Sequence, residues 1–301
     1  MGRFTAASRV ATARLPGILW VQMLPYLHLG SFSLGTFGIF MWLAAVTAAF
    51  VLHRSFVRAG VSADAVVVVS VVMIAGVLGA KVWHELQHSA QLRIAMQEVL
   101  APGLSHPQEV LLRFFHWFQA GFAWFGGLLF GIAALIWQGR GNGLRPLRVL
   151  DLAAPAAAIG YGVGRIGCLT SGDGDYGIAT KLPWGVHIHD DALDPPQPNP
   201  PGLLVHPTPI YELLFSAALC WYLWLRGKRD LPLGQLTGEY LVLSGIGRFL
   251  VEIIRRNERL YLGMSNAQVA ALGTVVVGVV LMVGASRNGH AAMPRERAAT
   301  T

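Results

Sequence analysis

Four long stretches of this sequence contain no aspartate, glutamate, lysine or arginine. They run from Leu15 to His53, from Ala65 to Ala80, from Phe114 to Gly139 and from Leu260 to Ser286. A helix of about 20 apolar residues crosses the hydrocarbon core of a bilayer. Only 13% of the residues are charged and 54% are hydrophobic, whereas soluble domains carry about 25% charged residues. The chain is therefore predicted to be an integral membrane protein.

Three further apolar segments tolerate a few ionisable residues: Val149–Thr170, Tyr211–Leu225 and Glu239–Ile254. In the first charge-free stretch, two prolines before residue 31 make Ser31–His53 the expected helix. The sequence thus predicts an all-α integral membrane protein with about seven transmembrane helices.

Lysine and arginine are concentrated in one set of the loops between the predicted helices, which is the set expected in the cytoplasm. That set holds Arg54, Arg58, Arg140, Arg145, Arg148, Arg226, Lys228, Arg229, Arg287, Arg295 and Arg297. The N-terminus is then expected outside and the C-terminus in the cytoplasm, although Arg3, Arg9 and Arg14 act against this orientation. We expect an N-terminal arm (1–30), a transmembrane domain (31–285) and a cytoplasmic tail (286–301). The net charge of +7 is assigned to membrane topology rather than to a nucleic-acid partner.

The segment 171–205 differs from the rest because it is polar, acidic and rich in proline. It is predicted to be an extracytoplasmic loop that forms a small head. His187 and His189 have the alternating spacing of an extended segment, but without further ligands we expect no metal site. Cys168 and Cys220 allow no disulfide framework, and no cofactor is expected.

Arg165 lies near the end of a predicted helix, in the glycine-rich string GYGVGRIGCLTSGDGDYG (160–177). An ionisable group at membrane depth is costly and points to function. A guanidinium beside exposed backbone amides suits a phosphate or a carboxylate. The alternative is that Arg165 reaches the membrane interface or pairs with Asp173.

Arg248 and Glu252 are four residues apart in SGIGRFLVEIIRR and share one face of a predicted helix. A structural ion pair explains them equally well. A second buried arginine nevertheless permits a site in which two arginines bind one anionic headgroup.

The string HPTPIYE (206–212) lies where the polar loop re-enters the membrane. His206, Tyr211 and Glu212 are expected to present polar groups at the interface. A histidine in such a place acts either as a hydrogen-bond anchor or as a base.

Taken in order, these motifs resemble those of the prolipoprotein diacylglyceryl transferase family. GRIGCLTSGDGDYG is similar to that family's GRxGNFxNGE, HPTPIYE to HPSQLYE, and GIGRFLVEIIRR to RFxVEFFR. FGGLLFG (125–131) is similar to HGGLxG, and LGAKV (78–82) stands where the family has a glycine-arginine pair. The resemblance extends from about residue 29 to residue 283.

The resemblance implies a seven-helix bacterial plasma-membrane enzyme with a periplasmic head. Its substrates are phosphatidylglycerol and the signal peptide of a preprolipoprotein, whose cysteine thiol attacks the glyceryl carbon and releases glycerol 1-phosphate. By position, Arg165 holds the lipid phosphate, and Arg248 with Glu252 completes the catalytic site. The implied substrate-binding residues are Arg165, Gly172, Asp173, His206, Tyr211 and Glu212.

Five positions depart from the family pattern: Phe37, Lys81, Phe125, Cys168 and Asp173. Phe125 replaces a histidine, and phenylalanine neither accepts a proton nor makes a hydrogen bond through its side chain. Either His84, His116 or Asp173 takes over the histidine's role, or the chain is a divergent member that transfers or binds a different phospholipid headgroup. A non-catalytic lipid-binding or transport protein is the third alternative.

Overall fold

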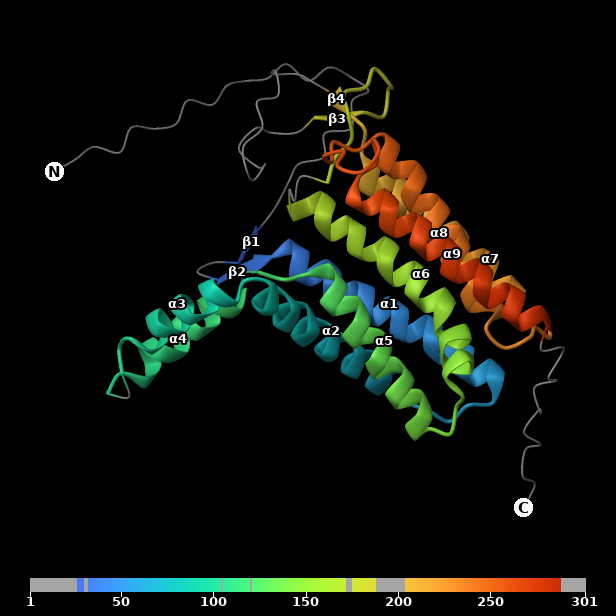
Figure 1. The fold of residues 1–301 in the computed structure, drawn as a ribbon, viewed down its shortest axis with the longest axis horizontal. Helices are drawn as coiled ribbons and strands as arrows, with labels where there is room; N and C mark the ends of the chain where they lie inside the picture. Colours follow the sequence, from blue (N-terminus) through green and yellow to red (C-terminus); the bar gives the residue numbers. More distant parts are fainter. Residues whose placement is uncertain are drawn as a thin grey trace.

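The computed structural model describes residues 26–29, 32–103, 105–119, 121–171, 175–187 and 204–287. Within these residues the chain forms nine helices and two small antiparallel sheets (Figure 1). The helices are α1 (Thr36–Ala59), α2 (Ala65–Gln87), α3 (Ser89–Leu100), α4 (Pro107–Gln119), α5 (Trp124–Gly141), α6 (Pro146–Ser171), α7 (Thr208–Arg226), α8 (Gln235–Ile253) and α9 (Asn266–Arg287). The strands are β1 (Tyr26–Leu29), β2 (Phe32–Gly35), β3 (Val186–His187) and β4 (Leu204–Val205).

Four of these helices, α1, α2, α6 and α9, are long and apolar enough to cross a membrane. Their outer faces expose large apolar side chains, among them Trp42 on α1, Ile74 on α2 and Val280 on α9. Such faces need lipid around them. The chain is therefore a mainly helical membrane protein, as the sequence predicts.

The first and third charge-free stretches differ from their predicted form. The first transmembrane helix begins at Thr36 rather than at residue 31, because the β1–β2 hairpin precedes it. The stretch Phe114–Gly139 contains two helices, since α4 ends at Gln119 and α5 begins at Trp124. Gly121 between them has φ 73°, a conformation that ends a helix and that glycine adopts without strain. Figure 1 shows α3 and α4 as a hairpin that extends away from the other helices.

Glycines bring α2 and α5 into close contact. A Cβ added to Gly79 would lie 2.7 Å from the Gly126 carbonyl oxygen, and one added to Gly126 would lie 2.2 Å from the Gly79 carbonyl oxygen. No other residue fits at these two positions without separating the helices. Close helix packing thus explains why the double glycine of FGGLLFG is needed.

Helix α6 lies at the centre of the molecule, where α1 and α7 pack along it (Figure 1). Near its start, the buried Asp151 accepts hydrogen bonds from the Gly234 amide at 2.7 Å and from the Thr237 amide and hydroxyl at 2.8 and 2.6 Å. A carboxylate of α6 therefore caps the N-terminus of α8. This contact fixes the two helices relative to each other and carries α8 toward the end of α6 that holds Arg165.

Candidate functional site

One short segment connects the ends of the helices that form the candidate site. The Gly177 amide donates to the His206 carbonyl oxygen at 2.9 Å, just before α7, and the Ile178 amide donates to the Ile254 carbonyl oxygen at 2.8 Å, just after α8. The segment itself follows α6, after the residues 172–174 that lie outside the described chain. The last turns of α6 and α8 and the first turn of α7 are thereby held together.

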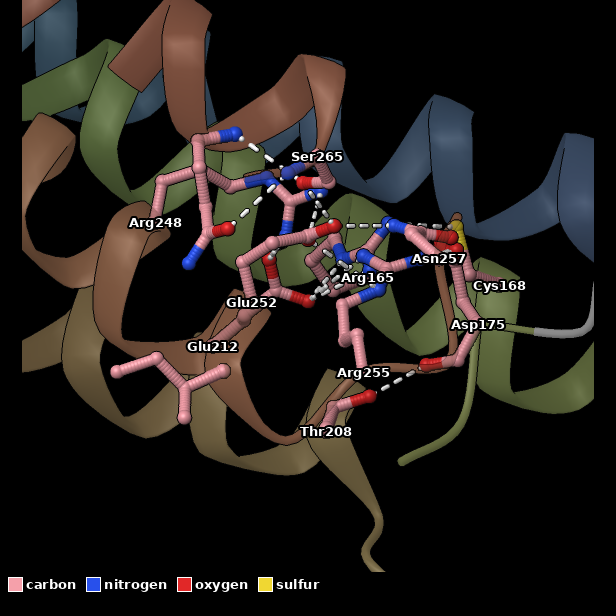
Figure 2. Close-up of polar contacts among 12 residues, drawn as sticks. Arg165, Cys168, Asp175, Thr208, Glu212, Arg248, Glu252, Arg255, Asn257 and Ser265 are labelled. Atoms are coloured by element: carbon pink, nitrogen blue, oxygen red, sulfur yellow. Dashed lines mark hydrogen bonds and ion pairs between the residues drawn. The ribbon is translucent and has the colours of Figure 1, made fainter. Parts of the chain in front are cut away.

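Arg165 of α6 lies between two carboxylates at this meeting point (Figure 2). Its Nε and Nη2 contact Glu212 Oε2 at 2.7 and 2.6 Å, and its Nη1 contacts Asp175 Oδ2. Tyr161, one turn earlier on α6, donates its hydroxyl to Glu212 Oε1. Arg165 is therefore paired in this structure, and its described partners are Asp175 and Glu212. Asp173, which the sequence offered as the partner, lies outside the described residues, as does Gly172.

Arg248 and Glu252 form the ion pair that their spacing predicts, with 2.9 Å between Arg248 Nη2 and Glu252 Oε2. Glu252 is fully buried, and its Oε1 accepts hydrogen bonds from Asn257 Nδ2 at 2.6 Å and from Ser265 Oγ at 2.7 Å. Arg248 also lies 3.6 Å from Glu212 through its Nη1. Arg165 and Arg248 therefore share Glu212, and the structure brings the two predicted arginines to one carboxylate.

A third arginine, Arg255, completes the site. Its Nη2 contacts Asp175 Oδ1, and its Nη1 and Nε lie 3.9 Å from Glu212 and 3.8 Å from Glu252. Neither Arg255 nor Asp175 is predicted from the sequence to lie in the site. Arg255 follows the last turn of α8, where arginine is common as a solvated residue, and no spacing rule connects it with Asp175.

We call Arg165, Arg248, Arg255, Asp175, Glu212 and Glu252 the buried charge cluster. Their side chains are between 0 and 27% exposed, and three positive charges balance three negative ones. Ion pairing offsets the cost of holding charge at this depth. Two buried guanidinium nitrogens, Nη2 of Arg165 and Nη1 of Arg248, face Glu212 at 2.6 and 3.6 Å as ion-pair contacts and make no hydrogen bond within the described chain. Two arginines of the cluster therefore direct donors at one carboxylate, and an anionic oxygen in its place would meet both.

His206, Tyr211 and Trp184 form a separate polar group beside the cluster. Tyr211 places its hydroxyl 3.1 Å from His206 Nδ1 and 2.8 Å from Trp184 Nε1, which donates to it. The arrangement links the start of α7 to the segment before β3. Of the string HPTPIYE, Glu212 extends its carboxylate into the charge cluster, and the Thr208 hydroxyl donates to the Asp175 carbonyl oxygen at its edge.

The positions that depart from the family pattern fall in two places. Cys168 is buried one turn after Arg165, whose Nη1 lies 3.4 Å from its Sγ. Phe125 is in the first turn of α5, packs against Trp124 and is 53% exposed. Lys81 forms an ion pair with Glu85 at 2.9 Å and lies over the Trp117 ring, at the other side of the α2–α5 contact.

His84 and His116, offered as substitutes for the missing histidine, lie in the region of α2 and α4. The His84 ring stacks on His88 with 4.3 Å between centroids, and His116 is exposed on α4. Their role stays a prediction.

Comparison with known proteins agrees with this arrangement. The family model described as prolipoprotein diacylglyceryl transferase matches residues 25–284. This range includes every described helix except the last three residues of α9.

Several curated relatives carry the name phosphatidylglycerol–prolipoprotein diacylglyceryl transferase. The protein from Leifsonia xyli is 30% identical over 290 residues, which are 94% of this chain and 83% of the relative. The protein from Methylibium petroleiphilum is 32% identical over 260 residues, 83% of this chain and 88% of the relative. The protein from Geobacter sulfurreducens is 27% identical over 271 residues, 87% of this chain and 95% of the relative.

Proposed function

The chain belongs to the prolipoprotein diacylglyceryl transferase family, and we propose that it moves a diacylglyceryl group from phosphatidylglycerol to the cysteine thiol of a preprolipoprotein in lipoprotein biosynthesis. The observation that carries the proposal is the convergence of two guanidinium groups, Arg165 and Arg248, on one buried carboxylate, Glu212. A phosphate that takes the place of this carboxylate contacts both arginines.

In the proposed reaction, the cysteine sulfur attacks as a thiolate and forms a bond to the glyceryl carbon next to the phosphate. The carbon–oxygen bond to the phosphate breaks, its electron pair stays on the phosphate oxygen, and glycerol 1-phosphate leaves. Negative charge develops on that oxygen in the transition state. Arg165 and Arg248 supply fixed donors for it and are the catalytic residues of this proposal.

Glu252 acts in this proposal by positioning Arg248. Glu252 is fully buried, and its Oε1 accepts from Asn257 and Ser265. Its Oε2 holds Arg248 Nη2, while Arg248 Nη1 faces Glu212. Glu212 holds Arg165 from the opposite side. The cluster has equal numbers of both charges, so each arginine already has a carboxylate partner. An incoming phosphate therefore takes the place of one carboxylate contact.

The substrate-binding role of the head is proposed for Gly172, Asp173, His206 and Tyr211. Its support is the contact of Tyr211 with His206 and with Trp184, which ties the re-entry point of the loop to the segment before β3. In this proposal the loop region 171–205 receives the signal peptide from the extracytoplasmic side.

We propose further that all seven long helices, α1, α2 and α5–α9, span the bacterial inner membrane, within a domain that covers residues 31–285. The position of arginine supports a cytoplasmic C-terminus and an extracytoplasmic N-terminus. Arginines lie at the helix ends that this orientation places in the cytoplasm. They are Arg58 on α1, Arg140 on α5, Arg148 on α6, Arg226 on α7 and Arg287 on α9.

Expression in bacteria depleted of their own diacylglyceryl transferase tests the function. The expected product is a lipobox peptide heavier by one diacylglyceryl group, with release of glycerol 1-phosphate. A peptide whose cysteine is replaced by serine is the substrate control. Arg165→Gln should abolish the product, whereas Arg113→Gln, which removes an exposed arginine of α4, should leave it. Folded protein without any modified peptide would refute the proposal.

A second candidate function is transfer of a different phospholipid headgroup, and Phe125 favours it. The side chain at this position is 53% exposed and has no group that transfers a proton. Mass spectrometry of total lipids before and after expression distinguishes the two reactions. A non-catalytic lipid carrier instead predicts that Arg165→Ala abolishes lipid binding while no covalent product is ever detected.

A further inference from the structure

A second pair of arginines lies at the opposite end of α6 from the charge cluster. Arg148 is in the first turn of α6, and Arg58 is in the last turn of α1, which packs along α6. At 1.5 Å per residue along the helix, Arg148 lies about 25 Å from Arg165. The two arginine groups therefore face opposite ends of the bundle.

Arg58 is held in place by α7. Its Nη1 donates to the Trp224 carbonyl oxygen at 3.1 Å, and its guanidinium carbon lies 4.2 Å from the centre of the Trp224 ring. A Cβ added to Gly160 of α6 would lie 3.3 Å from the Ala48 Cβ of α1, and this antiparallel register places Arg148 beside Arg58. Two guanidinium groups from separate helices thus gather beside the end of α7.

This pair has fewer carboxylates beside it than the charge cluster, because Asp151, three residues after Arg148 on α6, is the acidic side chain next to it. The Arg148 side chain makes no hydrogen bond and no ion pair within the part of the chain that the structure describes. Asp151 is the acidic group that acts on Arg148, but both of its oxygens accept hydrogen bonds from the start of α8. The N-terminus of α6 adds further positive potential. By contrast, Arg226 nearby on α7 is paired with Glu239.

The depth of the pair points to a lipid as its partner. The ends of α1 and α6, two helices that are long and apolar enough to span, lie near the headgroups, and tryptophan prefers this level. Basic pockets between membrane helices bind anionic headgroups, and a guanidinium matches a phosphate with two parallel hydrogen bonds. We propose that Arg58 and Arg148 form a binding site for the phosphate of an anionic membrane lipid, separate from the charge cluster. The proposal does not depend on transferase activity.

Native mass spectrometry of the full chain in detergent tests this site, with dioleoyl phosphatidylglycerol and dioleoyl phosphatidylcholine as probes. The site variant is Arg58→Gln with Arg148→Gln. The matched control is Arg140→Gln with Arg287→Gln, which removes the same charge from exposed helix ends at the same side. The site variant should retain phosphatidylglycerol about tenfold less well than the control, with no change for phosphatidylcholine.

Equal weakening in both double variants would overturn the site, because only a diffuse attraction would then be present. If the double variant does not fold, Arg148→Gln alone replaces it, because this side chain makes no hydrogen bond or ion pair in the described chain. The single variant should also retain less phosphatidylglycerol than the control. Inorganic phosphate without lipid is the third probe. Protection against thermal unfolding by phosphate equal to that by phosphatidylglycerol would overturn the assignment to a lipid.

Discussion

Arg165→Lys separates the geometry of the proposed catalytic arginine from its charge. Lysine keeps the formal charge of the cluster, so the three carboxylates retain three cations. Glu212 also keeps Tyr161 as a donor and Arg248 at 3.6 Å. The variant should therefore fold, with the free energy of unfolding lowered by about 1 kcal/mol, as for a lost hydrogen bond.

The activity should fall much further, because a single ammonium cannot reproduce the contacts of the guanidinium. Arg165 reaches Glu212 through two nitrogens at 2.7 and 2.6 Å and contacts Asp175 through the third. These carboxylates come from different elements, and only a planar fork spans them and presents two parallel donors to a phosphate that takes the place of one of them. Loss of one donor to a developing oxyanion costs roughly 100-fold or more in rate, or about 2.7 kcal/mol.

The assay measures diacylglyceryl transfer to a lipobox peptide per folded protein, with thermal unfolding in detergent measured in parallel. The expected result is a loss of about 100-fold in kcat/KM with a nearly unchanged unfolding temperature. Activity equal to that of the unchanged protein would refute the role assigned to Arg165, because charge alone would then be sufficient. A collapse of both activity and unfolding temperature would show instead that Arg165 is structural.

Three further changes test the packing and the charge balance by thermal unfolding in detergent. Glu252→Gln leaves a buried cation without its partner and should destabilise the protein by about 3 kcal/mol. Gly126→Ala should cost about 1–3 kcal/mol, since its Cβ would overlap Gly79, whereas Gly131→Ala, with its nearest neighbour at 3.7 Å, should cost little. Asp151→Ala removes the cap of α8 and should lower the free energy of unfolding by about 1–2 kcal/mol. An unchanged unfolding temperature for Glu252→Gln, Gly126→Ala or Asp151→Ala would contradict the role assigned to that residue.

The long helices could be predicted because their signal is local. Long runs without charge identify α1, α2 and α9 directly, and α6–α8 differ from them only by a few ionisable residues. The break between α4 and α5 escaped this reasoning, because apolar residues continue through it. The residue that marks the break is Gly121, which has a positive φ. A hydropathy pattern does not report this backbone conformation.

The charge cluster could be predicted only where its residues share a helix or a recognisable motif. Arg248 and Glu252 are one turn apart, so their contact follows from helix geometry. Arg165 and Glu212 are 47 residues apart and were found through the glycine-rich string and HPTPIYE. Asp175 and Arg255 approach each other only because the segment after α6 pairs with the end of α8, and no spacing in the sequence encodes this tertiary contact.

The charge balance of the site fits a substrate with one negative charge. The buried charge cluster is neutral by itself, which lowers the cost of its depth in the membrane. Arg259 lies at its rim, and within the described residues its acceptors are neutral: Gln268 Oε1 and the carbonyl oxygens of Glu252 and Ile253. With Arg259 the group carries one excess positive charge, since four arginines face three carboxylates, and a phosphodiester brings one negative charge to neutralise it. The released phosphate monoester carries nearly two negative charges, and one of them has no partner in this group. The charge balance that favours binding of the lipid therefore also favours release of the product.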